Sequence, residues 1–175
     1  MKPRKFSMAL ENEAIPYLIA ETAYIHEGNF EYMLRLVKKI IEKKCCDAVK
    51  FQILVDLDSY ITQSHKQYGL YKRMMMSKDK WKRILSYVKS KNVEVIVLAD
   101  DIKAIEFVKE NIKLIDAIEL HAIALNNVEM LDKIKDIKIP IILGIGGSKV
   151  EDIEFALNFL KREDVLLMHG FQNYP

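Results

Sequence analysis

Ionisable and amide side chains in this sequence of 175 residues gather where short apolar segments end. The side chains placed in this way are Glu21, His26, Lys50, Gln52, Asp100, Asp101, Glu119, His121 and His169. Carboxylates and imidazoles are common ligands of divalent metal ions, so a shared position for them indicates a metal site. A hydrogen-bonded structural role is the alternative for each histidine taken alone, and spacing leaves both interpretations open.

Lys50 is unusual because it lies inside the apolar segment 48–52. Removing an ammonium group from water is costly, so a lysine in a buried strand needs an anion or a water-filled cavity. If the segment lines a barrel, Lys50 can point into the lumen and bind a phosphate or a carboxylate. The alternative is a position at a sheet edge that faces solvent, and we favour the anion-binding role.

The elements that would position these side chains repeat along the second half of the chain. Apolar segments rich in β-branched residues begin at residues 93, 117, 140 and 165, which are 24, 23 and 25 residues apart. The stretches between them have the apolar periodicity of amphipathic helices. This alternation predicts βαβ units and a parallel sheet.

The first half of the chain shows the same unit with a longer insertion. We expect strands at 17–20 and 48–51, and helices over 30–44 and 77–90. Residues 53–76 form a connection too long for a simple turn. They are expected to be a functional loop or lid or, equally, a surface excursion with a short helix of its own.

Six such strands fit an eightfold (β/α) barrel or a doubly wound open sheet. In both folds the site lies beyond the carboxyl ends of the strands, where the polar residues fall. The first strand-to-helix turn lacks the pattern G-x-G-x-x-G, which weakens the dinucleotide-binding form of the open sheet. Residues 144–148, G-I-G-G-S, precede a helix. They offer an anion-binding turn or a capping box through Ser148 and Glu151, and we favour the capping box.

Composition excludes several classes of function. The formal net charge of +2 gives no basic footprint for nucleic acid, and no apolar run has the length of a membrane helix. The first 13 residues lack the apolar core of a secretory signal, and the adjacent Cys45 and Cys46 imply no disulfide framework. We therefore expect a cytoplasmic protein that binds neither membranes nor nucleic acid.

Four stretches resemble the N-acetylneuraminate (sialic acid) synthase family in order and spacing. They are 19–28 (I-A-E-T-A-Y-I-H-E-G), 47–52 (D-A-V-K-F-Q), 140–146 (P-I-I-L-G-I-G) and 166–175 (L-L-M-H-G-F-Q-N-Y-P). The resemblance implies an α/β fold of the (β/α)8 TIM-barrel type, with about six of eight βα units present. Residues 1–175 would then form one partial barrel domain, with 1–13 as an N-terminal extension and 53–76 as an inserted loop.

The resemblance also implies a reaction and a set of site residues. Family members condense phosphoenolpyruvate with an N-acylmannosamine-type sugar, and a divalent ion, manganese or magnesium, polarises the sugar aldehyde. Carried over by position, Glu21 would be the catalytic acidic residue and His169 a metal ligand. Lys50 would hold phosphoenolpyruvate, and Gln52 would contact the sugar.

Departures from the family pattern support an alternative, a non-catalytic barrel relative that binds a different ligand or a protein partner. Residues 98–101 (L-A-D-D) stand where the family has S-T-P-F, and 144–146 (G-I-G) replace S-T-G. Glu119 stands where the family has a lysine and would repel an anionic ligand. In either case a partial barrel has two open sheet edges, which predicts a homo-oligomer or completion of the barrel by missing sequence.

Overall fold

Short β-branched segments form six parallel strands, and at least one helix joins each strand to the next. The computed structural model describes Phe6 and residues 16–170. The sheet order β1-β2-β3-β4-β5-β6 places every strand beside its neighbour in the sequence. The strands are β1 (Ile19–Glu21), β2 (Ala48–Ile53), β3 (Glu94–Ala99), β4 (Ala117–Leu120), β5 (Ile141–Gly144) and β6 (Val165–Met168).

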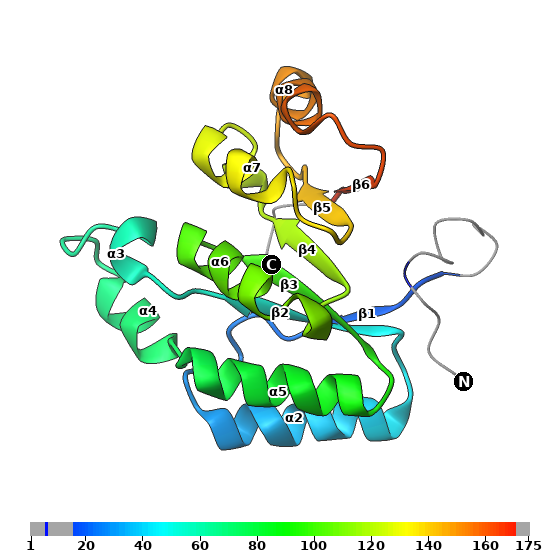
Figure 1. Cartoon of the computed structure of the whole chain (residues 1–175). Coiled ribbons are helices and arrows are strands. Elements are labelled where there is room, and N and C mark those ends of the chain that lie inside the picture. Colours follow the sequence, from blue (N-terminus) through cyan, green and yellow to red (C-terminus); the bar gives the residue numbers. More distant parts are fainter. Residues whose placement is uncertain (1–5, 7–15, 171–175) are drawn as a thin grey trace.

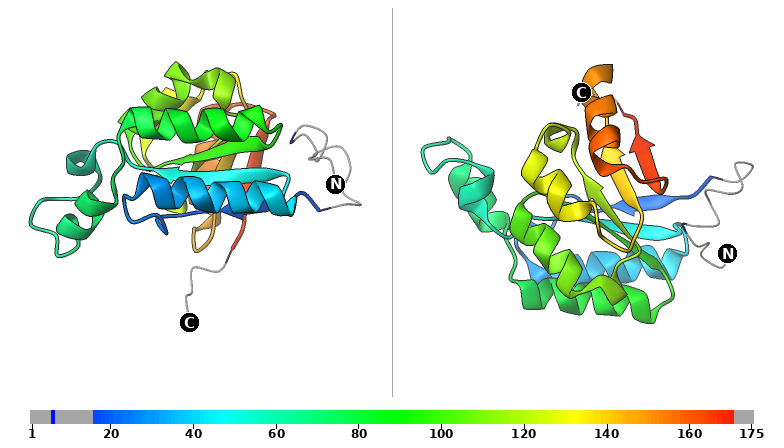
Figure 2. Two further views of the ribbon diagram at one scale, coloured as in Figure 1. Left: turned by 90° about the horizontal axis from the view of Figure 1, so that it is seen from below. Right: turned by 45° about the horizontal axis from the view of Figure 1, so that its top comes forward.

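Helices cover one face of this sheet. In Figures 1 and 2 they follow one another around the outside of a curled sheet, which leaves the inner face concave. They are α2 (Phe30–Lys43), α5 (Lys78–Ser90), α6 (Ile102–Glu110), α7 (Val128–Ile134) and α8 (Val150–Leu160). Sequential strand order with helices on one face is a half-barrel, which confirms the TIM-barrel-like prediction and excludes the doubly wound sheet.

Two apolar cores follow from the alternation of side chains along each strand. The larger core lies between the sheet and its helices and includes Phe51, Trp81 and Phe107. The smaller core lies on the concave face, where Ala48, Ile96, Ala117 and Ile142 pack together with Phe6. Because this inner core occupies the beginning of the strands, their carboxyl ends are left to polar side chains.

Residues 53–76 contain two short helices, α3 (Leu57–Tyr60) and α4 (Tyr68–Met74), which project from the carboxyl-end rim in Figure 1. The turn after β1 packs closely at Gly28 against the end of residues 53–76. The backbone of Gly28 has φ +77°, and an added Cβ would lie 2.1 Å from the carbonyl oxygen of Arg73. The H-E-G sequence at 26–28 therefore has a packing reason, because only glycine fits this close approach.

One local prediction is wrong and two others lie largely outside the described residues. The N-cap of α8 is Lys149, and no side chain caps it, so Ser148 and Glu151 form no capping box. The predicted N-terminal extension, residues 1–13, is described only at Phe6, whose ring packs edge-on against Tyr17 at 5.3 Å. Of the family-like segment 166–175, residues 171–175 lie outside the described part.

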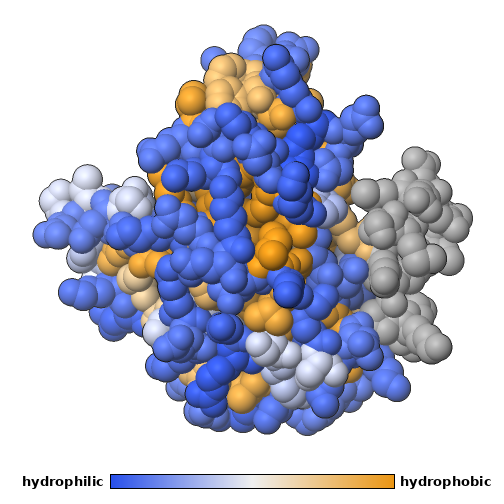
Figure 3. Space-filling view, in the orientation of Figure 1, coloured by the Kyte–Doolittle hydropathy of each residue, from blue (hydrophilic) through white to orange (hydrophobic). Residues whose placement is uncertain are grey.

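The visible surface in Figure 3 is mainly hydrophilic, and apolar residues reach it in narrower patches. No helix in the described part of the chain is long and apolar enough to cross a membrane.

His26 gives the fold a predicted dependence on pH. The imidazole is 1% exposed, it packs edge-on against Trp81 at 5.3 Å, and burial lowers its pKa to about 4. Because the unfolded chain has the ordinary value of about 6.5, stability is full above that pH and falls as the pH drops towards 4. Urea unfolding across this range should show the loss in the wild type. In His26→Phe the loss of stability caused by this imidazole should be absent. A pH dependence of unfolding identical to that of the wild type would contradict the account.

Candidate functional site

A polar pocket lies on the concave face at the carboxyl ends of the strands. It encloses about 210 Å³. The side chains that line it and carry polar atoms or sulfur are Glu21, Lys50, Gln52, Glu119, His121 and Met168. Five of the residues named from the sequence therefore face one hollow, namely Glu21, Lys50, Gln52, Glu119 and His121.

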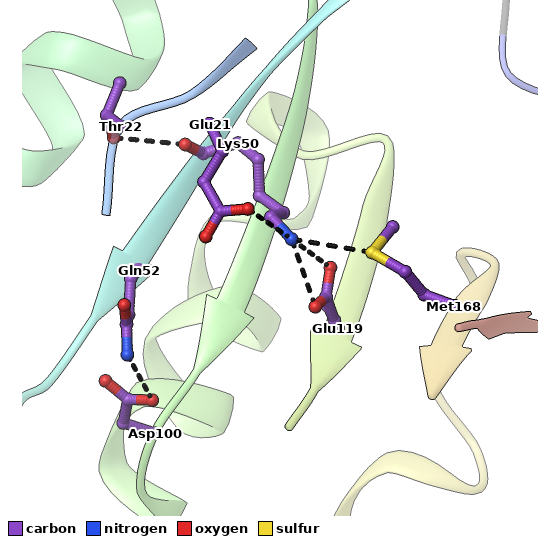
Figure 4. Close-up of polar contacts among 7 residues, drawn as sticks. All are labelled: Glu21, Thr22, Lys50, Gln52, Asp100, Glu119 and Met168. Carbon is purple, nitrogen blue, oxygen red and sulfur yellow. Dashed lines mark hydrogen bonds and ion pairs between the residues drawn. The ribbon is translucent and has the colours of Figure 1, made fainter. Parts of the chain in front are cut away.

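Lys50 is the centre of the pocket (Figure 4). Its Nζ lies 2.9 and 3.1 Å from the two carboxylate oxygens of Glu119 and 3.0 Å from Oε2 of Glu21. The sulfur of Met168 is 3.7 Å away. An ammonium group has three hydrogens to donate, so the two carboxylates and the sulfur account for all of them.

The strand register explains why these side chains meet. Glu21 of β1 pairs directly with Lys50 of β2, and alternation along β2 directs Lys50 to the concave side. Glu119 comes from β4, whose register partner in β3 is Leu98. The side chains of Lys50 and Glu119 are each 5% exposed, whereas the side chain of Glu21 is 46% exposed.

Charges in the pocket favour an ionised pair. Burial alone would lower the pKa of Lys50, but attraction and hydrogen bonds from Glu119 and Glu21 outweigh it and raise that pKa. Burial raises the pKa of Glu119, and Lys50 opposes this shift. With one ammonium and two carboxylates, the group formed by Glu21, Lys50 and Glu119 carries a formal charge of −1.

Gln52 extends from the pocket towards a second hollow of about 260 Å³, which is lined by Tyr60, Asp100 and His121 among others. Its amide donates a hydrogen bond of 3.2 Å to Asp100, and the hydroxyl of Tyr24 donates to the other oxygen of that carboxylate. His121 lines both hollows. Asp100 is thus connected to the pocket by the hydrogen bond from Gln52 without lining it.

Asp100 is expected to titrate near neutral pH. Burial raises its pKa to about 7, and the hydrogen bonds from Tyr24 and Gln52 partly oppose the shift. Because the unfolded value is about 3.8, the stability due to this carboxyl is lost as the pH rises towards 7. A carbon-13 NMR titration of Asp100 should give a midpoint of about 7 in the wild type. Tyr24→Phe, which removes an opposing hydrogen bond, should move that midpoint higher. A midpoint near the ordinary aspartate value would contradict the assignment.

The other residues named from the sequence lie elsewhere. Asp101 is buried, caps α6, and its carboxylate accepts backbone hydrogen bonds from Val55, Asp56 and Ala104. His26 is buried against Trp81. His169 is exposed beyond β6 and does not line the pocket, although Met168 and Gly170 on either side of it do.

The metal site expected from the sequence is not tested by the described residues. Among Phe6 and residues 16–170, no three His, Cys, Asp or Glu side chains are grouped to hold a metal ion. His169 as a metal ligand therefore stays a prediction.

The sequence analysis did not identify Met168 and Tyr24 as residues of the site. The alternation of β6 carries the signal for Met168, because Leu166 and Met168 share the concave face. Tyr24 lies within the family-like stretch 19–28, but only its contact with Asp100 shows that it bears on the site.

A comparison with protein-family models identifies the family of this chain. The family model described as "NeuB family" matches residues 36–175. An N-acetylneuraminate-9-phosphate synthase of Drosophila melanogaster is 27% identical, covering 91% of this chain and 46% of that protein. An uncharacterized protein of Methanocaldococcus jannaschii is 26% identical over 91% of this chain and 47% of its own length.

The solved structures support the fold. The N-acetylneuraminic acid synthetase of Leptospira borgpetersenii, in complex with citrate, superposes with a TM-score of 0.81 at 21% identity. The match covers 91% of this chain and 56% of that one. This chain spans about half the length of the curated relatives it matches.

Proposed function

This chain belongs to the NeuB family, and from that membership we propose that it serves sialic-acid-synthase-like sugar biosynthesis. The proposed reaction condenses phosphoenolpyruvate with an N-acylmannosamine-type sugar. The observation that carries the proposal is the convergence of Glu21, Lys50 and Gln52 on one pocket at the carboxyl-end rim of the half-barrel. That rim is where (β/α) barrels place their chemistry.

The chemistry assigns a role to each side chain. A carbon–carbon bond forms between the methylene carbon of phosphoenolpyruvate and the aldehyde carbon of the open-chain sugar, one water is consumed, and inorganic phosphate is released. The ammonium of Lys50 would hold an anionic group of phosphoenolpyruvate, and the amide of Gln52 would hydrogen-bond the sugar. Glu21 is the more exposed carboxylate of the pocket, so it is placed to contact a reacting ligand.

A divalent ion, manganese or magnesium, is part of the proposal. When bound, it would polarise the sugar aldehyde towards attack. His169 would supply one ligand, and the others would come from outside the described residues. No step assigned above to Glu21, Lys50 or Gln52 depends on this ion.

Product analysis tests the proposal. The longest natural polypeptide that contains these residues is incubated with phosphoenolpyruvate, N-acetylmannosamine and manganese. We expect a nine-carbon sugar acid by mass spectrometry, with release of one phosphate per product. The absence of product and of phosphate release would contradict the proposed reaction, with Lys50→Met as the matched inactive control.

The pocket also favours a second candidate, a non-catalytic relative. Lys50 already has both carboxylates and a sulfur within contact distance, which leaves no hydrogen for a ligand unless one partner moves. Such a protein would bind a different ligand or a protein partner on the same scaffold. Formation of the nine-carbon acid would exclude this candidate.

Self-association is part of the proposal as well. β1 and β6 are the edge strands of the described sheet, and unpaired edges invite pairing with a second chain. Light scattering should give a mass above that of the monomer, and a monomer at every concentration would contradict it. From membership of the NeuB family we also propose a cytoplasmic location.

A further inference from the structure

The carboxylate of Glu119 already contacts the ammonium of Lys50 in the pocket. The side chains of Lys50 and Glu119 are both almost completely buried, and both carboxylate oxygens of Glu119 lie within hydrogen-bond distance of the Lys50 ammonium. A carboxylate or phosphate oxygen of a ligand would compete with these oxygens, because Glu119, Glu21 and Met168 account for the three hydrogens of the ammonium.

We propose that Glu119 acts as a built-in competitor for Lys50 and is the residue that sets the affinity of this pocket for anionic ligands. This inference rests on the proposed function, since the pocket is the one proposed to receive phosphoenolpyruvate. It adds the specificity-determining residue: the buried carboxylate of Glu119 competes with a negatively charged ligand for the ammonium and so lowers the affinity for that ligand.

Glu21 does not have the same effect. Its side chain is 46% exposed, so solvent screens its charge and the side chain can swing away. Glu119 is held in the interior, and repulsion of a ligand anion is strongest where water is excluded. The inner carboxylate therefore controls anion affinity more strongly than the outer one.

Calorimetric titration with phosphoenolpyruvate, and separately with inorganic phosphate, tests the proposal. Glu119→Gln should bind phosphoenolpyruvate at least about tenfold more tightly than the wild type, because it removes one charge and keeps the shape. The same change at Glu21 should give a smaller gain. Glu110→Gln, on the exposed end of α6, should leave the affinity unchanged.

The double variant Glu119→Gln/Lys50→Met identifies the group that binds the anion. The gain should disappear in it, because the freed ammonium is the proposed binding group. Equal affinity in the wild type and Glu119→Gln, or a gain that survives the loss of Lys50, would overturn the inference. If Glu119→Gln does not fold, Glu119→Ala takes its place, since Glu21 still pairs with Lys50 there.

These outcomes are separate from those of the proposed reaction. A wild type that makes product while Glu119→Gln shows no tighter binding would overturn the competitor role alone. Tighter binding by Glu119→Gln without product from any variant would support the competitor role and contradict the proposed reaction.

Discussion

Replacing Lys50 by methionine is expected to lower the free energy of unfolding by about 3–5 kcal/mol and to abolish product formation. The loss in stability arises because the buried carboxylate of Glu119 would lose its only close cation among the described residues. The loss in activity follows from the proposed role of Lys50 in holding phosphoenolpyruvate. Denaturant unfolding and the phosphate-release assay measure the two effects.

A double variant separates the cost of an unpaired charge from the cost of lost packing. Lys50→Met/Glu119→Leu replaces the buried pair with apolar side chains and should recover most of the stability, but not the activity. Lys39→Met is the matched control, because its partner Glu42 is also exposed and surface pairs contribute little. A single Lys50→Met variant as stable as the wild type would contradict the buried pair.

Replacing Asp101 by alanine is expected to cost about 2–4 kcal/mol, more than the loss of an ordinary helix cap. Its carboxylate accepts the N–H groups of Val55, Asp56 and Ala104, at 2.6, 3.2 and 2.9 Å. Alanine would leave all three donors without this partner, two of them at the start of the excursion that carries α3. Urea unfolding measures the cost.

Hydrogen exchange gives this prediction a local readout. The amides of Val55 and Asp56 should lose protection in Asp101→Ala, because the carboxylate that holds them is gone. Asn127→Ala removes the cap of α7, a single bond to Met130, and should cost less, about 1 kcal/mol. Equal costs for the two variants would contradict the role of Asp101 in pinning the excursion.

Much of the fold could be predicted because it depends on local pattern. The alternation of apolar strands and amphipathic helices identifies each βα unit. The starts predicted for the strands from residue 93 onwards agree with those of β3 to β6 to within one residue. The lysine within β2 signals the pocket, since a buried ammonium needs an anion. Sequential connections then bring the carboxyl ends of the strands together at one rim.

The partner of Lys50 could not be derived from local pattern. Glu119 lies 69 residues away in the sequence, and only the curl of the sheet brings β4 opposite β2. Sequence reasoning recognised that Glu119 would repel an anion but not that it would neutralise Lys50. The capping box predicted at Ser148 is a local motif, and it was nevertheless wrong. Helix α8 begins after Lys149, so Ser148 is not its N-cap.

The central claim is that Glu21, Lys50 and Gln52 form a pocket that receives phosphoenolpyruvate. The most direct measurement is a two-dimensional amide NMR spectrum of the wild-type protein during titration with that compound to millimolar concentration. We predict saturable shifts at the carboxyl ends of β1, β2 and β4, including Glu21, Lys50 and Gln52. Shifts confined to other parts of the sheet, or no shifts at all, would contradict the claim.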